Sequence, residues 1–112
     1  MSNFPSKLNI IAKNTDVYLK RVFSRQNNYS NLITPMKYGI LSGGKKFRSA
    51  IVVNTGKIFE INYKKLIIIS AAVECIHSYS LIHDDLPAMD DDDLRRGKPS
   101  MHKKFNEFTA IL

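Results

Sequence analysis

Apolar residues recur at helical spacing along most of this chain of 112 residues, and no stretch alternates with the period of two that marks a half-buried strand. An amphipathic helix over residues 5–24 is predicted by five apolar positions on one face: Leu8, Ile11, Leu19, Val22 and Phe23. The polar stretch 25–31 predicts a loop. Thr34 and Pro35 are typical of an N-cap and a first helical residue, and we expect this second helix to stop at Gly43-Gly44.

Three more helices are predicted downstream. The first covers about residues 46–59, and the second covers about 64–83, where apolar side chains extend nearly all the way round. A helix of that kind is usually buried inside a bundle. Residues 89–100 indicate a charged loop, and residues 101–112 predict a last helix that ends while still apolar. The pattern therefore predicts an all-α protein, and we expect it to be cut short of its whole bundle.

Composition places the chain among small globular proteins. It has a mass of 12.8 kDa, 44% apolar residues and 24% charged residues, which excludes a disordered tail and a two-domain enzyme. Cys75 stands alone, so no internal disulfide can form, and the first residues lack the basic-then-apolar build of a signal peptide. We therefore expect a cytoplasmic protein. The apolar run 66–73 is far shorter than the roughly 20 residues that cross a bilayer, so no membrane span is expected.

The net charge of +7 conceals an uneven distribution, because six of the ten acidic residues are aspartates within residues 84–93. A uniformly basic protein would indicate a nucleic-acid partner. A basic body with one dense acidic cluster indicates metal ions and anionic ligands instead. A nucleic-acid binder is the weakest of the functions considered, since no recognition helix or aromatic-basic surface accompanies the charge.

The aspartate cluster follows the carboxyl end of the most apolar helix, where the helix dipole already concentrates negative charge. Two carboxylates ~4 Å apart repel by about 4 kcal/mol at an effective dielectric constant of 20. Such a cluster is either a solvated acidic loop or a site for Mg²⁺, which binds carboxylates together with phosphate oxygens. Neighbouring residues favour the metal. His77 precedes Asp84 by seven residues, so both lie on one helix face about 10.5 Å apart.

Basic residues flank the glycine turn at residues 42–48 and follow the aspartates at Arg95-Arg96. The turn exposes backbone N–H groups, and Lys45 and Arg48 can add charge-assisted hydrogen bonds to an anion. It is not a Walker A loop, because the required spacing and the Ser/Thr after the lysine are missing. The aspartates do not form an EF-hand, which would need glycine at position 95. Together these segments predict a site for a metal-bound phosphate.

Two long segments resemble the trans-prenyl diphosphate synthases, in particular the bacterial enzymes whose product is farnesyl diphosphate. Residues 71–99, AAVECIHSYSLIHDDLPAMDDDDLRRGKP, are similar to the first aspartate-rich region of that family. Residues 38–48, YGILSGGKKFR, are similar to its segment for isopentenyl diphosphate. The resemblance covers nearly the whole chain from about residue 32. It implies the amino-terminal part of the isoprenoid-synthase helical bundle, with residues 1–112 forming a partial polyprenyl synthase domain.

The resemblance also implies roles for individual residues. Asp84 and Asp90 would be ligands of Mg²⁺, the implied cofactor, with Asp85 in support. Arg95 would bind the allylic diphosphate. The isopentenyl diphosphate would be held by four basic side chains: Lys45, Arg48, His77 and Arg96.

The implied reaction joins isopentenyl diphosphate to dimethylallyl or geranyl diphosphate and gives farnesyl diphosphate. The allylic C–O bond ionises, the alkene attacks the cation, and a proton is lost. Tyr79 and Ser80 occupy positions that line the floor of the product cavity in this family, and an aromatic residue there favours a short product. Ser49 departs from the proline usual in the family. The family norm is a homodimer, which the short length puts in doubt here.

The family's second aspartate-rich motif is absent from these 112 residues. We therefore expect the chain alone to be weak or inactive, and prone to aggregate through the exposed 66–82 helix. Two alternatives to a shortened synthase follow. The chain is half of a split synthase, or it is a binding subunit without catalytic activity.

Overall fold

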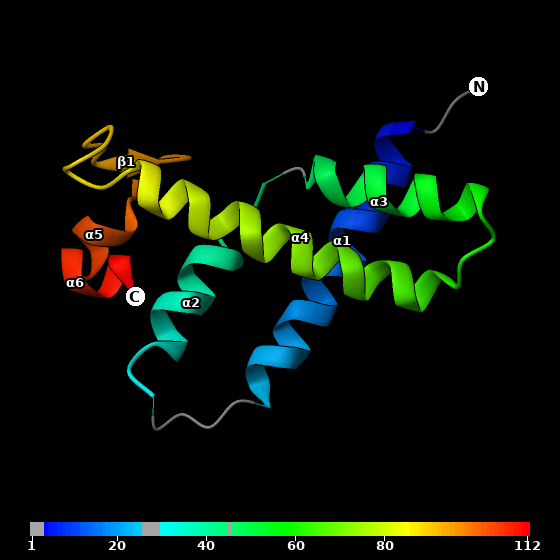
Figure 1. Ribbon diagram of the computed structural model, residues 1–112, viewed down its shortest axis with the longest axis horizontal. Coiled ribbons are helices and arrows are strands. Elements are labelled where there is room, and N and C mark those ends of the chain that lie inside the picture. The colour runs from blue at the N-terminus through cyan, green and yellow to red at the C-terminus, as the bar shows by residue number, and fades with distance from the viewer. Residues whose placement is uncertain (1–3, 26–29, 45) are drawn as a thin grey trace.

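The computed structural model describes residues 4–25, 30–44 and 46–112 (Figure 1). Within these ranges it consists of helices and one small hairpin, which confirms the all-α prediction. The elements in chain order are α1 (Phe4–Ser24), α2 (Ile33–Ile40), α3 (Phe47–Ile58), α4 (Tyr63–Asp84), β1 (Leu94–Arg95), β2 (Lys98–Pro99), α5 (Met101–Lys104) and α6 (Glu107–Ile111).

Helix α4 is the centre of the fold. It packs against α3 and α1 along its amino-terminal half and against α2 and α6 nearer its carboxyl end, beside the hairpin (Figure 1). Asn62 starts it, because its side-chain oxygen accepts hydrogen bonds from the backbone N–H groups of Lys64 at 2.9 Å and Lys65 at 3.4 Å. The predicted start at residue 64 is therefore one residue late, and the predicted end at residue 83 is one residue early.

Most of the buried apolar side chains form two clusters that follow one another along the same face of α1. One joins α1, α3 and α4 and consists of Ile11, Ala50, Val53, Leu66 and Ile67. The other joins α1, α2 and α4 and consists of Leu19, Phe23, Ile40 and Ala71. Three of the five apolar positions predicted for the first helix, Ile11, Leu19 and Phe23, are buried in these clusters, so its amphipathic character is confirmed.

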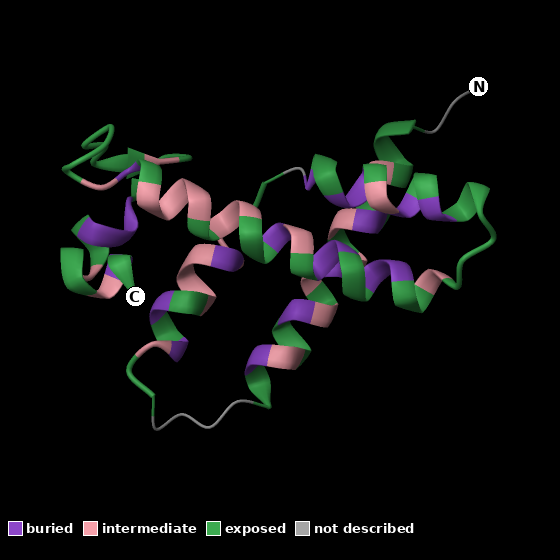
Figure 2. Ribbon diagram, viewed as in Figure 1, coloured by how far each residue is buried: buried purple, intermediate pink, exposed green. Residues whose placement is uncertain are grey.

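The molecule is a slab of 44 × 32 × 19 Å. Since a helix with its side chains is about 10 Å across, this thickness holds only two layers of helices, and within the described ranges no helix is enclosed on every side. Four large side chains of α4 are accordingly exposed by about half or more of their surface: Ile68, Ile69, Ile76 and Tyr79 (Figure 2). The expectation that α4 is buried all round is wrong here, and the expectation that it is exposed is confirmed for one face only, because Leu66, Ile67 and Ala71 on the other face are buried.

Helix α4 also has the length and hydropathy of a membrane span, with a mean hydropathy of 1.5 over its most apolar window. A core helix passes the same test, and α4 packs here against α1, α2 and α3 while carrying the buried Glu74. That the chain has no membrane span stays a prediction.

The second helix differs from its predicted bounds. It begins at Ile33 after an N-cap at Leu32, which makes no side-chain capping bond, so Thr34 is not the cap. It ends at Ile40, three residues before Gly43. Gly43 and Gly44 both have positive φ angles, 96° and 112°, and they shape the turn that follows the helix rather than its end.

The predicted charged loop contains a hairpin that the sequence analysis missed. Leu94 pairs with Pro99 and Arg95 with Lys98, and the two residues between them, Arg96 and Gly97, both have positive φ. Positive φ at both central positions is typical of a type I′ turn, whose twist suits a two-residue hairpin. A strand pair this short has too few residues for a period-2 pattern to be visible.

The single helix predicted over 101–112 is two short helices, α5 and α6, separated at Phe105-Asn106. The Asn106 side chain accepts a hydrogen bond from the backbone N–H of Thr109 at 2.7 Å and so starts a new helix. The apolar periodicity continues across the break, which is why it predicted one helix.

Candidate functional site

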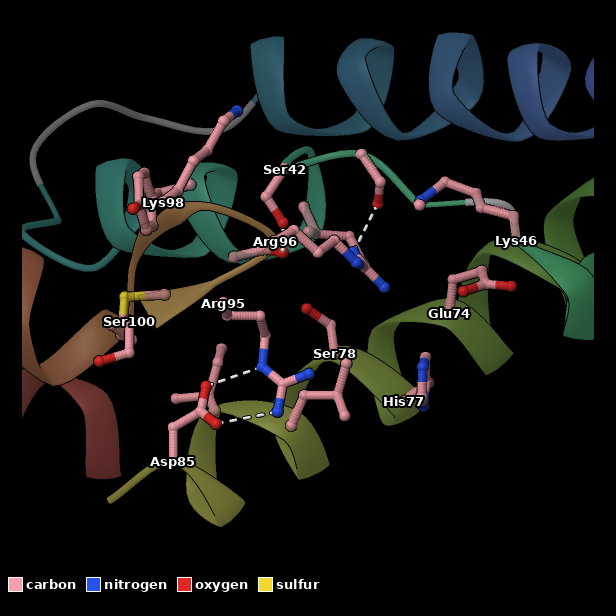
Figure 3. A pocket seen from close by; sticks show the side chains of 18 of the residues that line it. Ser42, Lys46, Glu74, His77, Ser78, Asp85, Arg95, Arg96, Lys98 and Ser100 are labelled. Atoms are coloured by element: carbon pink, nitrogen blue, oxygen red, sulfur yellow. Dashed lines mark hydrogen bonds and ion pairs between the residues drawn. The ribbon is translucent and has the colours of Figure 1, made fainter. Parts of the chain in front are cut away.

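A cavity of about 480 Å³ opens where the end of α2, the start of α3, the second half of α4 and the hairpin meet (Figure 3). Its lining brings together four of the predicted site residues from three separate elements: Arg48, His77, Arg95 and Arg96. Lys45, the fifth predicted basic residue, lies outside the described residues. The glycine turn at Gly43-Gly44 forms part of the same wall.

Arg48 and His77 face each other across the start of α3 and the middle of α4. The Arg48 Nη1 atom lies 3.3 Å from the His77 Nε2 atom. Burial lowers the pKa of His77, and the positive charge of Arg48 lowers it further. Two groups that can both be cationic are therefore held side by side, an arrangement suited to an anion that would contact both.

Arg96 reaches back from the hairpin to the glycine turn. Its Nη1 atom donates a hydrogen bond to the Gly43 carbonyl at 2.7 Å, and Figure 3 shows its side chain crossing the cavity toward that turn. A Cβ atom on Gly44 would lie only 2.8 Å from the Arg96 guanidinium, so the absence of a side chain leaves room for it. Arg96 itself has a φ of 52°, so the type I′ turn directs this side chain.

The aspartate-rich turn folds back over the end of α4. The backbone N–H of Asp90 donates to the Asp84 carbonyl at 2.9 Å, and that of Asp92 donates to the Asp85 carbonyl at 3.1 Å. These bonds satisfy carbonyls that a helix end leaves free, which explains how an acidic segment is tolerated there. They also bring Asp84 and Asp90 together, although six positions separate them in the sequence.

The three aspartates of the predicted metal motif have different surroundings. Asp84 and Asp90 are exposed, and among the described residues neither carboxylate takes part in an ion pair or a side-chain hydrogen bond. Asp85 is buried, at 2% exposure, and lines the cavity. Arg95 donates to it from Nε at 2.7 Å and from Nη2 at 2.8 Å, and this pairing raises the pKa of Arg95. Asp84 and Asp90 lie beside the cavity rather than among its described lining residues.

Asp84 and Asp90 offer the oxygen ligands that Mg²⁺ prefers, and no neighbouring cation competes for them within the described part of the chain. No group of three or more His, Cys, Asp or Glu side chains able to hold a metal ion occurs among these residues. Mg²⁺ is usually bound by one or two carboxylates together with water and substrate phosphates, so a pair is sufficient. The donor set fits the predicted ion.

Three charged residues that line the cavity were not assigned to the site from the sequence: Lys46, Glu74 and Lys98. Lys46, next to the predicted Lys45, is buried and pairs with Asp16 of α1, with 3.2 Å between Nζ and Oδ1. Glu74 is buried in α4, and its Oε1 atom accepts hydrogen bonds from the Ser49 backbone N–H and hydroxyl. A single acid in the middle of an apolar helix, one turn before His77, was the signal available for Glu74.

Tyr79 lies apart from this cavity. It stacks edge to face with His83, with ring centroids 5.6 Å apart, and lines a second, largely apolar cavity of about 390 Å³ between α2, α4 and α6. Among the described residues Ser80 lines neither cavity, and its hydroxyl bonds to the His77 carbonyl.

Comparison with known proteins gives consistent results. A family model described as polyprenyl synthetase matches residues 29–112. The farnesyl diphosphate synthase of Escherichia coli is 49% identical over 112 residues, covering 98% of this chain and 37% of the relative. That of Buchnera aphidicola from Acyrthosiphon pisum is 53% identical over 83 residues, covering 74% of this chain and 29% of the relative.

Solved structures agree. A geranyltransferase from Legionella pneumophila superimposes with a TM-score of 0.89 at 42% identity, covering 95% of this chain and 38% of that one. A geranyltranstransferase from Thermotoga maritima gives a TM-score of 0.85 at 32% identity, covering 94% of this chain and 39% of that one. The chain therefore spans well under half the length of each of these proteins.

Proposed function

The chain belongs to the polyprenyl synthetase family, and we propose that it forms the first half of the active site of a Mg²⁺-dependent prenyltransferase of the farnesyl diphosphate synthase type. The resemblance found in the sequence is confirmed by the relatives, which carry that name. The fold is the amino-terminal part of their all-α fold. The activity, substrates and partners of the whole enzyme belong to proteins more than twice as long, and for this chain they are proposals.

The observation that carries the proposal is the convergence of Arg48, His77 and Arg96 on one cavity beside the aspartate turn. Among the described residues, these three side chains have no carboxylate partner. Two guanidinium groups held beside a histidine without acidic partners attract an anion, and the cavity of about 480 Å³ is large enough for a diphosphate. Isopentenyl diphosphate is the proposed ligand of this wall, with Lys45 as a further contact.

The allylic diphosphate, dimethylallyl or geranyl, is proposed to bind nearer Arg95, with Asp84 and Asp90 as the residues that would hold Mg²⁺. When bound, this ion supplies positive charge that neutralises the diphosphate as it leaves. Arg95 directs two donors at Asp85 and keeps Nη1 for a ligand. Leu81, Ile82 and Met101 contribute apolar lining, which favours exclusion of water from a carbocation.

These residues act by binding and orientation. Holding two diphosphates in one cavity converts an encounter between two substrates into a reaction within one complex. Cations fixed in advance around the leaving group stabilise its charge as the C–O bond breaks. The chemistry needs no side-chain nucleophile. The farnesyl product length and a cytoplasmic location stay predictions.

Calorimetry of the folded chain with inorganic pyrophosphate, with and without Mg²⁺, tests the proposal. We expect uptake that depends on Mg²⁺, and a loss of at least about tenfold in Asp84→Ala and in Asp90→Ala, since each removes a metal ligand. Asp93→Asn is the matched control, because Asp93 is exposed and pairs with Lys103 outside the cavity. No Mg²⁺-dependent uptake by the folded wild type, or equal losses in all three variants, would overturn the proposal.

Turnover is expected to be weak or absent in the chain alone. With Mg²⁺, geranyl diphosphate and isopentenyl diphosphate, the purified 112-residue chain should form product far more slowly than the typical enzyme range of 1–10³ per second. Turnover within that range would show that the chain suffices by itself.

The exposed apolar side chains of α4 are the surface through which the split-synthase alternative would act. Ile68, Ile69, Ile76 and Tyr79, which we call the α4 stripe, lie on a helix that is otherwise the core of the fold. The chain covers 37% of the Escherichia coli relative, so a polypeptide with the remaining part of that fold is the partner of matching chemistry. Association would remove the stripe from water and complete the cavity.

Mixing the chain with the remaining carboxyl-terminal part of the Escherichia coli relative tests this alternative. A split synthase predicts a one-to-one complex and restored turnover, both lost in Ile69→Ser/Ile76→Ser. Lys20→Ser, exposed on α1, is the control and should bind normally. A complex without turnover supports the binding-subunit reading, and no complex, or a complex insensitive to the double variant, contradicts the proposed use of the stripe.

A further inference from the structure

We propose that Glu74 is a positioning residue, whose carboxylate caps the start of α3 from the neighbouring helix α4 and thereby holds Arg48 beside His77. The proposal rests on the proposed function, in which Arg48 and His77 contact the diphosphate. It assigns a role to the buried acid in the cavity wall, which that function does not use.

The start of α3 lacks a cap of its own. Lys46 occupies the N-cap position with a left-handed φ of 49° and makes no side-chain capping bond. The first N–H groups of a helix have no partner inside the helix, and a buried N–H without a partner is costly. Ser49 is the third residue of α3 and is fully buried, so its N–H needs an acceptor from elsewhere.

Glu74 supplies that acceptor from α4. Its Oε1 atom lies 3.2 Å from the Ser49 backbone nitrogen and 2.8 Å from the Ser49 hydroxyl oxygen, and the Glu74 residue is only 5% exposed. A carboxylate at this place also suits the positive end of the α3 dipole. One oxygen of Glu74 on α4 therefore links the two helices at Ser49 of α3.

The Ser49–Glu74 link lies next to the Arg48–His77 contact. Arg48 immediately precedes Ser49 on α3, and His77 follows Glu74 by three residues, about one turn, on α4. Figure 3 shows Glu74 and His77 on the same helix, both beside the cavity. The Ser49–Glu74 bonds thus fix the register of α3 against α4 one position away from the 3.3 Å approach of Arg48 to His77.

A clamp is needed at this place because the two site residues repel when His77 is protonated. The pKa of His77 is lowered by burial, and then by Arg48, Arg96 and Arg95, while Glu74 acts in the opposite direction. When His77 is protonated and no ligand is bound, the imidazolium repels Arg48 and favours a position of Arg48 farther away. The bonds between Ser49 and Glu74 keep the backbone at Arg48 in place, so that Arg48 and His77 are already positioned when an anion binds.

Ser49 supplies both donors of this clamp, since its backbone N–H and its hydroxyl donate to the same Glu74 oxygen. Ser70, one turn before Glu74, adds a weaker link to the same place, with its hydroxyl 3.4 Å from the Ser49 carbonyl oxygen. Both sides of Ser49 are thus tied to α4.

A double-mutant cycle without any ligand tests the clamp. In the wild type, Arg48→Ala should raise the pKa of His77, measured from its ring protons by NMR. In a Glu74→Gln background, which keeps an oxygen acceptor, Arg48→Ala should shift the His77 pKa by the same amount as in the wild type. In a Glu74→Ala background, where Arg48 is no longer held, the shift should be less than half as large. A shift of full size in Glu74→Ala would overturn the proposal.

Binding provides the second readout. Glu74→Ala should weaken Mg²⁺-dependent pyrophosphate binding at least tenfold, while Glu74→Gln stays within about threefold of the wild type. Asn62→Ala is the matched control, because it removes the cap of α4 far from the cavity and should lower the melting temperature without changing pyrophosphate binding. Equal binding losses in Glu74→Ala and Asn62→Ala would mean that Glu74 only stabilises the fold, and would overturn the proposal.

Ser49→Ala serves if Glu74→Ala does not fold. It removes only the hydroxyl donor at 2.8 Å and keeps the N–H. In this background Arg48→Ala should shift the His77 pKa measurably less than in the wild type, but the reduction should be smaller than the one expected with Glu74→Ala. No change in Ser49→Ala would count against the clamp. A wild type that binds no pyrophosphate would overturn the proposed function, whereas the ligand-free cycle would still decide the role of Glu74.

Discussion

The Arg95 guanidinium donates two hydrogen bonds to the Asp85 carboxylate, and this pair ties the hairpin to the end of α4. It fixes the position of the hairpin whose next residue, Arg96, reaches the glycine turn. Arg95 therefore helps to position Arg96, in addition to the diphosphate contact proposed for its own Nη1 atom.

We expect Arg95→Ala to lower the free energy of unfolding by about 2 kcal/mol, because Asp85 would be left buried without a partner. The loss is smaller than the roughly 3–5 kcal/mol of a fully buried pair, since the Arg95 side chain is 32% exposed. Urea unfolding measures it. Lys103→Ala is the control: its partner Asp93 is 72% exposed, so the change should stay below about 0.5 kcal/mol. Equal losses would contradict a structural role for the Arg95–Asp85 pair.

The pKa of His77 should rise toward its ordinary value of 6.5 in Arg48→Ala, because the second cause of its lowering is removed. Because folding lowers this pKa, the unfolded state binds more protons, so His77 costs stability as the pH falls from about 6.5 through the folded value. Arg48→Ala should reduce that loss. Lys57→Ala, at the far end of α3, should leave the NMR titration of His77 unchanged. An unshifted pKa in Arg48→Ala would contradict the 3.3 Å contact.

Gly44→Ala should weaken Mg²⁺-dependent pyrophosphate binding by at least roughly tenfold, since one charge-assisted hydrogen bond contributes about 1.5–3 kcal/mol and about 1.4 kcal/mol corresponds to tenfold. The new Cβ would lie 2.8 Å from the Arg96 guanidinium and displace it. Gly43→Ala is the matched control, because its φ of 96° brings similar backbone strain, whereas its Cβ would meet nothing within 4 Å. Calorimetry compares the two variants, and the idea fails if both lose binding equally.

Gly56→Ala should destabilise the fold by about 1–3 kcal/mol, although alanine favours a helix over glycine by about 1 kcal/mol. Its Cβ would collide with both Cδ atoms of the buried Leu66, where α3 crosses α4. Thermal and urea unfolding measure the change. In a Leu66→Ala background the same substitution should cost less, since the obstructing methyl groups are gone. A more stable Gly56→Ala protein would refute this close approach.

Much of the fold follows from the sequence because helices are local. The spacing of apolar residues placed α1, α3 and α4 to within one or two residues, since each bond of a helix joins residues four apart. The glycines at 43–44 predicted a turn correctly but not the end of α2, and Arg96-Gly97 was not recognised as a hairpin turn. In both cases short elements are shaped by what they pack against.

The candidate site was found from the sequence as a set of residue types, and the structure arranged them. Arg48, His77, Arg95 and Arg96 meet in one cavity, as expected of residues that bind two substrates that react with each other. Their partners came only from the structure: Arg95 with Asp85, and Arg48 with His77. The roles of Asp84 and Asp90 as metal ligands stay predictions.

The sequence by itself determined the helices, the aspartate and arginine motifs, and the family, because these depend on residues that are neighbours along the chain. Only the tertiary structure decided that Glu74 meets Ser49, that Arg96 reaches Gly43, and which side of α4 stays exposed. The first two contacts join residues that are 25 and 53 positions apart in the sequence. The exposed side of α4 depends on how many layers of helices fit within the thickness of the molecule. No local pattern encodes them, since the direction in which two helices face each other is set by the packing of both.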